Sequence, residues 1–245
     1  MKFINLTPEN IAAEHLCCII RSKKPHAGVE AKREWLARRL CEGHVFRKLD
    51  VKGAVFIEYA PLDKAWTPIT GANCLYIYCL WVNTLRGEGY GRQLMEYCIE
   101  DARAQGRSGV CMLGAKKQKA WLSDQQFAKR FGFKTVDETA GGFELLALSF
   151  DGSAPAFTPA AKAEAIESRA LTAYYTPQCP YTVQALAAVR EVCAEKGVPC
   201  DIVCVDSLEA AKALPCAFNN FALFYNGKLQ TVNLPDAALL RRILK

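Results

Sequence analysis

A glycine-rich turn that follows the apolar segment 74–82 has the residue types and spacing to bind an anion. Glycine adopts a positive φ without steric cost and lets the backbone approach a ligand closely. The first N–H groups of a following helix lack intrahelical partners and carry partial positive charge. A strand, this turn and a helix in that order therefore predict a binding site for a phosphate group. The turn consists of Arg86, Gly87, Glu88, Gly89, Tyr90, Gly91 and Arg92.

The spacing of this turn narrows the class of ligand. The pattern R-x-x-G-x-G lacks the six-position glycine fingerprint of dinucleotide-binding folds, and it lacks the Gly-Lys-Ser/Thr ending of a Walker loop. An ordinary turn before a surface helix is the alternative interpretation. Leu94, Cys98 and Ala102 recur every four residues after the turn, which predicts an amphipathic helix to about Gln105.

The turn also resembles a family motif. Arg86, Gly89 and Gly91 stand at the fixed positions of the acyl-CoA-binding motif of the GNAT N-acetyltransferases. Segment 124–134 is similar to the late helix of that family, which ends in a Gly-Phe pair. Segments 14–18, 56–59, 79–82 and 174–180 resemble the two-domain YoaP-like acetyltransferases. Together these resemblances span nearly the whole chain.

The resemblance implies a cofactor and a reaction. The cofactor would be acetyl-CoA, with backbone groups of Leu80, Trp81 and Val82 pairing with its pantetheine arm and the main-chain N–H groups of Arg86 to Arg92 holding its pyrophosphate. An amine of a small molecule or peptide would lose a proton and attack the thioester carbonyl directly, and the CoA thiolate would leave.

Three residues are candidates for accepting the amine proton. Glu58 is the only carboxylate in its apolar strand, and burial between Ile57 and Tyr59 would raise its pKa; an outward, solvated position is the alternative. Glu14 and His15 belong to the expected first helix, near which many relatives bind substrate; a surface or structural role is the favoured alternative for them.

One position departs from the family pattern. Many GNAT enzymes have a tyrosine four residues before the glycine of the late Gly-Phe pair, where its hydroxyl protonates the departing thiolate. Here that position is Ala128, and neighbouring Phe127 and Phe131 carry no hydroxyl. Another group, water or direct release of the thiolate must serve, or the chain binds acyl-CoA without transferring the acyl group.

Cys179 supports an alternative function. It precedes an expected helix, whose N–H groups would stabilise a thiolate, in a turn that resembles the active turn of glutaredoxins. The partner position of a C-x-x-C pair holds Thr182, and Phe221 occupies the place of the usual cis-proline. The alternatives are a structural or substrate-shaping domain, and an acyl-CoA-binding sensor fused to a monothiol redox or thiol-binding module.

Charge and composition limit the partners. The 245 residues carry a net charge of +6, and residues 1–150 hold all of it, with 22 Lys and Arg against 16 Asp and Glu. That half is the one with the phosphate-binding turn, which favours an anionic cofactor. The basic residues show no aromatic interleaving, so no nucleic-acid partner is expected. The sequence gives no indication of the oligomeric state.

The remaining composition indicates a cytoplasmic location. We expect no membrane span, because no apolar run reaches about 18 residues, and the first residues lack the apolar core of a signal peptide. We therefore expect the twelve cysteines to be reduced and mostly buried. With no C-x-x-C pair and three histidines, no metal site is expected.

The elements that position these residues predict an α/β (α+β mixed) fold of two domains. A GNAT domain, residues 1–150, would contain a mixed sheet flanked by helices, and a smaller thioredoxin-like, YoaP-like domain, residues 165–245, would follow a linker at 151–159. The expected helices are 7–20, 29–40, 90–105, 122–130, 181–196, 208–214 and 235–244. The expected strands are 3–6, 45–51, 54–59, 74–82, 110–113, 133–136, 143–150, 170–176, 200–205, 221–225 and 228–233.

Overall fold

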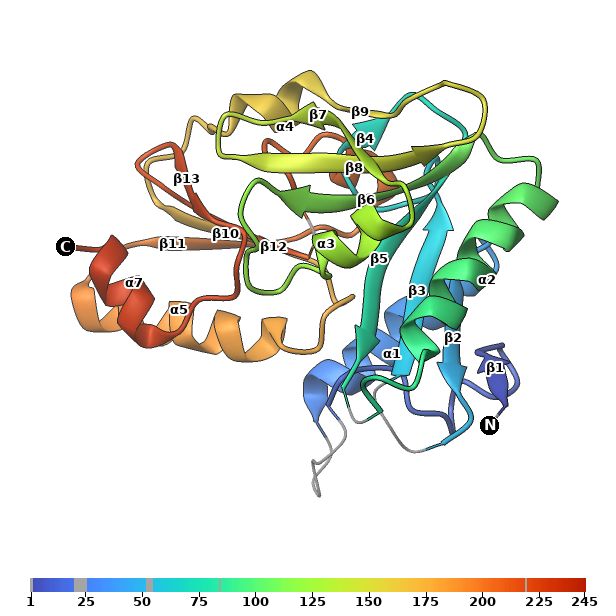
Figure 1. Cartoon of the computed structure of the whole chain (residues 1–245). Coiled ribbons are helices and arrows are strands. Elements are labelled where there is room, and N and C mark those ends of the chain that lie inside the picture. Colours follow the sequence, from blue (N-terminus) through green and yellow to red (C-terminus); the bar gives the residue numbers. More distant parts are fainter. Residues whose placement is uncertain (1, 20–25, 52–54, 84, 219) are drawn as a thin grey trace.

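A seven-stranded mixed sheet forms the first half of the molecule (Figure 1). The computed structural model describes residues 2–19, 26–51, 55–83, 85–218 and 220–245. The strand order is β1-β2-β3-β5-β6-β8-β7, in which β5 and β6 are parallel and the other neighbours are antiparallel. The strands are β1 (Phe3–Asn5), β2 (Val45–Leu49), β3 (Val55–Pro61), β5 (Cys74–Val82), β6 (Gly109–Ala115), β7 (Lys134–Glu138) and β8 (Phe143–Ser149).

Helices cover both faces of this sheet, as the apolar patterns predict. On one face α1 (Ala27–Leu40) packs Trp35 and Leu36 against Phe56 of β3. On the other face α2 (Tyr90–Ala104) buries Leu94, Met95, Cys98 and Ala102, the stripe expected from the sequence. The predicted fold class, a mixed sheet flanked by helices, is confirmed.

A bulge in β5 opens the sheet beside β6. Glu58 of β3 pairs with Cys79, whereas Tyr59 pairs with Ile77, so Tyr78 is an extra residue in β5. The parallel pairing of β5 with β6 ends at Ile77 and Met112, and β5 continues to Val82 without it. Bulges bend a strand and redirect its side chains. The final five residues of β5 thus border an opening between two strands.

The second half contains a four-stranded sheet of order β11-β10-β12-β13. The β-α-β-α-β-β-α order expected from the sequence is the order observed from β10 onward. α5 packs against α7, and the apolar side chains of both contribute to a separate core. The elements are β10 (Leu171–Tyr175), α5 (Thr182–Lys196), β11 (Cys200–Cys204), α6 (Leu208–Lys212), β12 (Phe221–Tyr225), β13 (Lys228–Thr231) and α7 (Ala237–Ile243).

The two halves share buried surface. One continuous cluster of buried side chains includes Trp66 and Tyr76 of the first half together with Leu214, Phe218 and Phe224 of the second. Segment 151–159, expected to be an irregular linker, contains β9 (Ala156–Phe157), which pairs with β4 (Ile69–Thr70) and precedes α4 (Pro159–Ala163). The connection is therefore packed onto the first half.

The predicted helix over 7–20 is wrong for the described residues to 19, which form turns. The cause is competition for backbone groups. The Asn10 side chain accepts from Thr7 N–H at 2.8 Å and donates to Asn5 O at 3.0 Å. The Arg33 guanidinium donates to the carbonyls of Ile11 and Glu14, which a continuing helix would need for its own bonds.

A smaller difference concerns the start of α3. The late helix was expected to begin at Leu122, but α3 spans Gln125–Arg130, because Asp124 caps it by accepting from Gln126 N–H and Phe127 N–H. Gly53 and Ile20, which the sequence placed at a turn and a helix end, lie outside the described residues. Within the described ranges, no helix has both the length and the apolarity to cross a membrane.

Candidate active site

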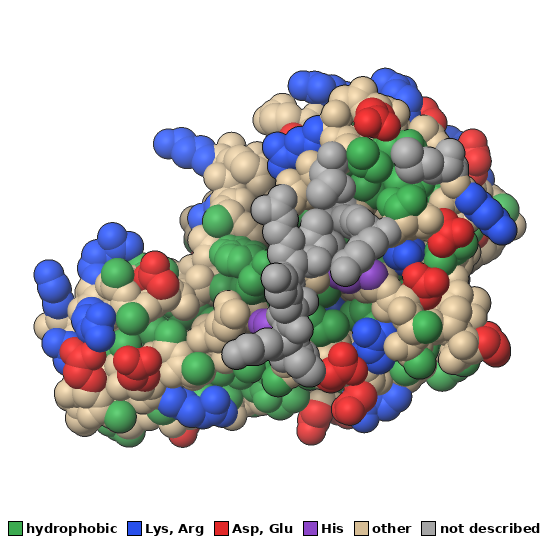
Figure 2. Space-filling view, turned by 90° about the horizontal axis from the view of Figure 1, so that it is seen from below, with side chains coloured by type: hydrophobic (Ala, Val, Ile, Leu, Met, Phe, Trp, Pro, Cys, Tyr) green, Lys and Arg blue, Asp and Glu red, His purple; other side chains and the backbone are tan. Residues whose placement is uncertain are grey.

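A pocket of about 310 Å³ lies where the two halves meet the open end of β5. Its walls come from seven separate segments of the chain. Figure 2 shows a face of the molecule on which acidic and basic side chains are interspersed over both halves. The lining consists of Cys17, Cys18, Lys32, Phe56, Tyr78, Cys79, Trp81, Asn83, Trp121, Leu122, Ser123, Gln178, Cys179, Pro180, Tyr181 and Asn220.

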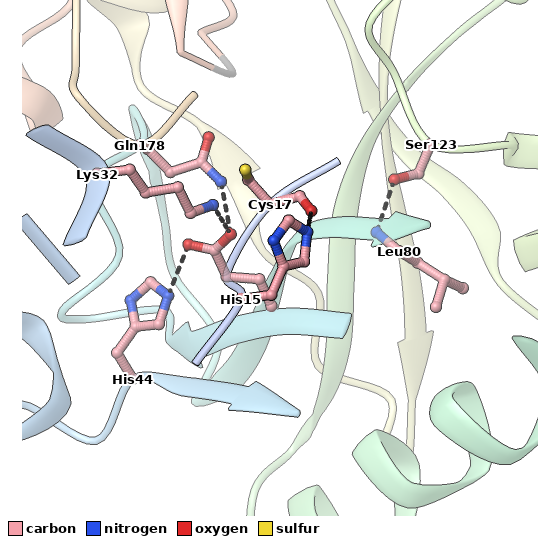
Figure 3. A network of polar contacts seen from close by, with 8 residues as sticks. His15, Cys17, Lys32, His44, Leu80, Ser123 and Gln178 are labelled. Atoms are coloured by element: carbon pink, nitrogen blue, oxygen red, sulfur yellow. Dashed lines mark hydrogen bonds and ion pairs between the residues drawn. The ribbon is translucent and has the colours of Figure 1, made fainter. Parts of the chain in front are cut away.

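Glu58 lies behind this pocket at the centre of a buried polar network. One of its carboxylate oxygens accepts from Lys32 Nζ at 2.6 Å and from Gln178 Nε2 at 2.8 Å, and the other lies 3.1 Å from His44 Nε2 (Figure 3). The Glu58 side chain is 0% exposed. Gln178 comes from the second half, so the network joins the two halves.

The charge state of Glu58 differs from the sequence prediction. Burial acts to raise the pKa of its carboxyl, but the Lys32 ammonium and the His44 hydrogen bond outweigh burial, and the net pKa is lowered. Burial likewise acts to lower the pKa of Lys32, and Glu58 reverses that effect. The expectation that burial would raise the pKa of Glu58 is therefore wrong. The carboxylate is not solvated; it is the buried anion of an ion pair with Lys32.

Glu14 and His15 lie in the N-terminal turns rather than on a helix. Glu14 Oε2 accepts from Lys48 Nζ at 2.7 Å, and this ion pair ties the segment to β2. His15 Nε2 contacts the carbonyl of Cys17 (Figure 3). Neither side chain lines the pocket, although Cys17 does.

Cys179 lies in the pocket wall with three other thiols. Burial raises its pKa to about 12, and burial also raises the pKa values of Cys17, Cys18 and Cys79. The thiolate expected at Cys179 from the helix that follows is thus not favoured, because burial outweighs the donors of the turn. All twelve cysteines are free thiols, and six of them are buried.

Backbone groups of Leu80 and Val82 in β5 face the opening. Leu80 N–H donates to Ser123 Oγ at 3.1 Å, across the gap between β5 and the segment before α3 (Figure 3). Because backbone groups alternate along a strand, Val82 faces the same side as Leu80, and its carbonyl accepts from Arg86 Nε at 3.2 Å. Trp81 faces β3 with its backbone and lines the pocket with its side chain.

The glycine-rich turn connects this strand to α2. Gly87 and Gly89 have φ of 88° and 80°, which only glycine adopts readily. Gly89 is the N-cap of α2 and has no side chain to cap it, and the first helical bond runs from Gln93 N–H to Gly89 O. The N–H groups of the first turn of α2 therefore point to a position that an anion would occupy.

Comparison with known proteins identifies the family. Residues 10–133 match the acetyltransferase (GNAT) family, and residues 199–242 match the YoaP-like family. The chain belongs to the GNAT acetyltransferase family. It is 38% identical to the uncharacterized N-acetyltransferase YoaP of Bacillus subtilis (strain 168), over all of this chain and 98% of that protein. The GNAT and YoaP-like resemblances seen in the sequence are confirmed.

Solved structures of acetyltransferases are similar to about three fifths of the chain. A putative GNAT acetyltransferase of Desulfovibrio desulfuricans is 19% identical and covers 60% of this chain and 98% of its own, with a TM-score of 0.42. A GNAT acetyltransferase of Brucella melitensis in complex with acetyl-CoA is 16% identical and covers 64% of this chain and 92% of its own, with a TM-score of 0.40.

Sequence reasoning missed Lys32, His44, Gln178 and Ser123. A signal for Lys32 was present, because it lies on the buried stripe of α1 with Gly28, Trp35 and Leu36, and a charge on such a stripe indicates a buried partner. No spacing could have joined Gln178 to Glu58, which is 120 residues away.

Proposed function

We propose that the chain is an acetyl-CoA-dependent N-acetyltransferase that acts on an amine of a small molecule or peptide. The observation that carries this proposal is that three features lie next to one another along residues 78–92. These features are the pocket between the halves, the open edge of β5 and the uncapped start of α2. Family membership supplies the reaction class.

The residues at the opening fit an acyl-CoA. The N–H groups at the start of α2 would hold its pyrophosphate, helped by Arg86, and Leu80 and Val82 would pair with its pantetheine amides. When bound, acetyl-CoA supplies an acyl group activated as a thioester. The chain orients the acceptor in the pocket and excludes water from it, since positioning alone contributes strongly to bimolecular transfer.

The second half is proposed to shape the acceptor site. Gln178, Cys179, Pro180 and Tyr181 form one wall of the pocket. This role fits a domain division at 1–150 and 165–245, a thioredoxin-like second domain and a cytoplasmic location, all of which belong to the proposal. The raised pKa of Cys179 does not favour the alternative of a monothiol redox or thiol-binding module.

The phosphate-binding role of the turn is tested with two matched glycines of α2. Gly89 at its start and Gly106 after its end have positive φ, so alanine at either position imposes similar backbone strain. We expect Gly89→Ala to raise the Kd for acetyl-CoA at least about fivefold and Gly106→Ala to leave it unchanged. Isothermal titration calorimetry measures both, and equal effects of the two variants would contradict the assignment.

A further inference from the structure

We infer, resting on the proposed acetyl transfer, that the acceptor is a small aromatic amine that enters the pocket uncharged, an arylamine being the simplest case. The inference comes from the chemical character of the pocket wall: its charges, its proton acceptors and its aromatic surface. Each of the three narrows the class of amine independently.

The pocket lacks a counterion for a cationic amine. Among the sixteen described residues that line it, none is Asp or Glu, and Lys32 is the one charged residue. The residues of the chain that lie outside the described ranges are 1, 20–25, 52–54, 84 and 219, and none of them is Asp or Glu. Glu58 is shielded behind Lys32 and has no exposed surface. The one charged group that an ammonium would meet inside the described wall is the Lys32 ammonium, so polyamines and other polycations are disfavoured.

The described wall also lacks a proton acceptor. Its titratable groups are Lys32 from α1, Cys17 and Cys18 from the N-terminal segment, Tyr78 and Cys79 from β5, and Cys179 and Tyr181 from the second half. Lys32 is a cation held by Glu58, and burial keeps the thiols and phenols neutral. An acceptor that is already unprotonated at neutral pH needs no base.

Aromatic side chains line the outer part of the pocket. The side chains of Trp81 and Trp121 are 37% and 45% exposed, although tryptophan is highly buried on average. The Trp121 and Tyr181 rings lie 5.3 Å apart, one from each half of the chain. Rings in this arrangement provide a face on which a flat apolar body can stack.

The transfer balances without a basic residue. The neutral amine nitrogen forms the new C–N bond to the acetyl carbon, and the C–S bond of the thioester breaks. The excess proton on nitrogen then passes to the departing CoA thiolate, either directly or through water. The products are the N-acetylated amine and CoA as a thiol, so no oxidant or further reactant is required.

The experiment measures CoA release with four acceptors: para-toluidine, benzylamine, spermidine and a peptide with a free N-terminus. We expect kcat/KM to be highest for para-toluidine, by at least about tenfold over spermidine. Across neutral pH the rate should stay flat with para-toluidine and rise with pH for benzylamine, following the ionisation of that amine. A preference for spermidine or the peptide would overturn the substrate class and leave the proposed function intact. Binding of acetyl-CoA with no transfer to any amine would overturn both.

Two variants separate recognition from folding. Tyr181→Ala should raise KM for para-toluidine about threefold to tenfold, with Val203→Ala, on the exposed surface of β11, as the matched control. Asn83→Asp places a carboxylate on the exposed rim of the pocket and should raise the ratio of benzylamine to para-toluidine activity at least about threefold. An unchanged ratio in Asn83→Asp and an unchanged KM in Tyr181→Ala would contradict the inference.

Discussion

Glu58 is buried beside the candidate active site, and all its polar contacts among the described residues are with groups that donate to it. It is enclosed by three donors, Lys32, His44 and Gln178, and its ion pair with Lys32 is excluded from solvent. Removing one member of a buried pair leaves the other charge uncompensated, which costs much more than the pair contributes. The sequence correctly singled out Glu58 as unusual, but its partners come from two other segments and decide its charge state.

We therefore expect Glu58→Gln to lower the free energy of unfolding by about 3–5 kcal/mol at pH 7. Glu96→Gln, which removes a surface partner of Arg92, should change it by less than about 0.5 kcal/mol. Urea denaturation measures both.

The folded pKa of Glu58 is lowered from its usual 4.5, so its stabilisation is present above that value and is lost as pH falls through the lower folded pKa. The deficit of Glu58→Gln should shrink accordingly in acid. A stable variant with lost activity would instead assign Glu58 to proton transfer.

At the scale of elements, the structure explains which predictions succeeded. α2 has a clear apolar stripe, and β3, β5, β6 and β8 are largely buried apolar runs, and these local signals were sufficient to predict them. The turns at 7–19 could not be predicted, because the groups that replace the helix bonds belong to Arg33, which lies on another element. The bulge at Tyr78 was equally hidden, since it is defined only by the pairing of β5 with β3.

The opening between β5 and β6 gives a prediction for Ser123. Its hydroxyl accepts from Leu80 N–H, a donor proposed to pair with the cofactor. Ser123→Ala frees this N–H, and a hydrogen bond is worth about 0.5–1.5 kcal/mol net. We expect the Kd for acetyl-CoA to fall roughly twofold to tenfold in calorimetry, whereas Ser153→Ala, on the exposed connection, leaves it unchanged. Weaker binding in Ser123→Ala would show that the hydroxyl assists the cofactor rather than competing with it.

At the scale of the whole molecule, the two halves depend on polar contacts as well as a shared core. Lys212 of α6 donates to the carbonyls of Leu62 and Ile69 at 2.8 Å each, and Thr67 Oγ1 donates to Phe218 O at 3.3 Å. The composition of each half gave no indication of these contacts, because they join residues about 150 positions apart.

Lys212 makes the junction between the halves sensitive to pH. Burial lowers the pKa of Lys212 from 10.5 to about 8. Between pH 8 and 10.5 the unfolded chain binds a proton that the folded chain has released, so this lysine increases the free energy of unfolding as pH rises.

Lys212→Met should lower the free energy of unfolding by about 1–3 kcal/mol at pH 7 by leaving two carbonyls without a donor. Its deficit should widen between pH 8 and 10.5. Denaturation at a series of pH values tests this, with Lys228→Met on β13 as the control, and a constant deficit would contradict it.

The pocket between the halves can form only late in synthesis of the chain. Its walls include Cys17 near the start of the chain and Gln178 to Tyr181 far along it. A ribosome delivers these segments in order, so a nascent chain that has completed the seven-stranded sheet still lacks one wall of the pocket. Until the segment that contains Gln178 has emerged and folded, Glu58 also lacks Gln178 as a partner. Synthesis at least through Asn220 is thus a condition for a closed pocket.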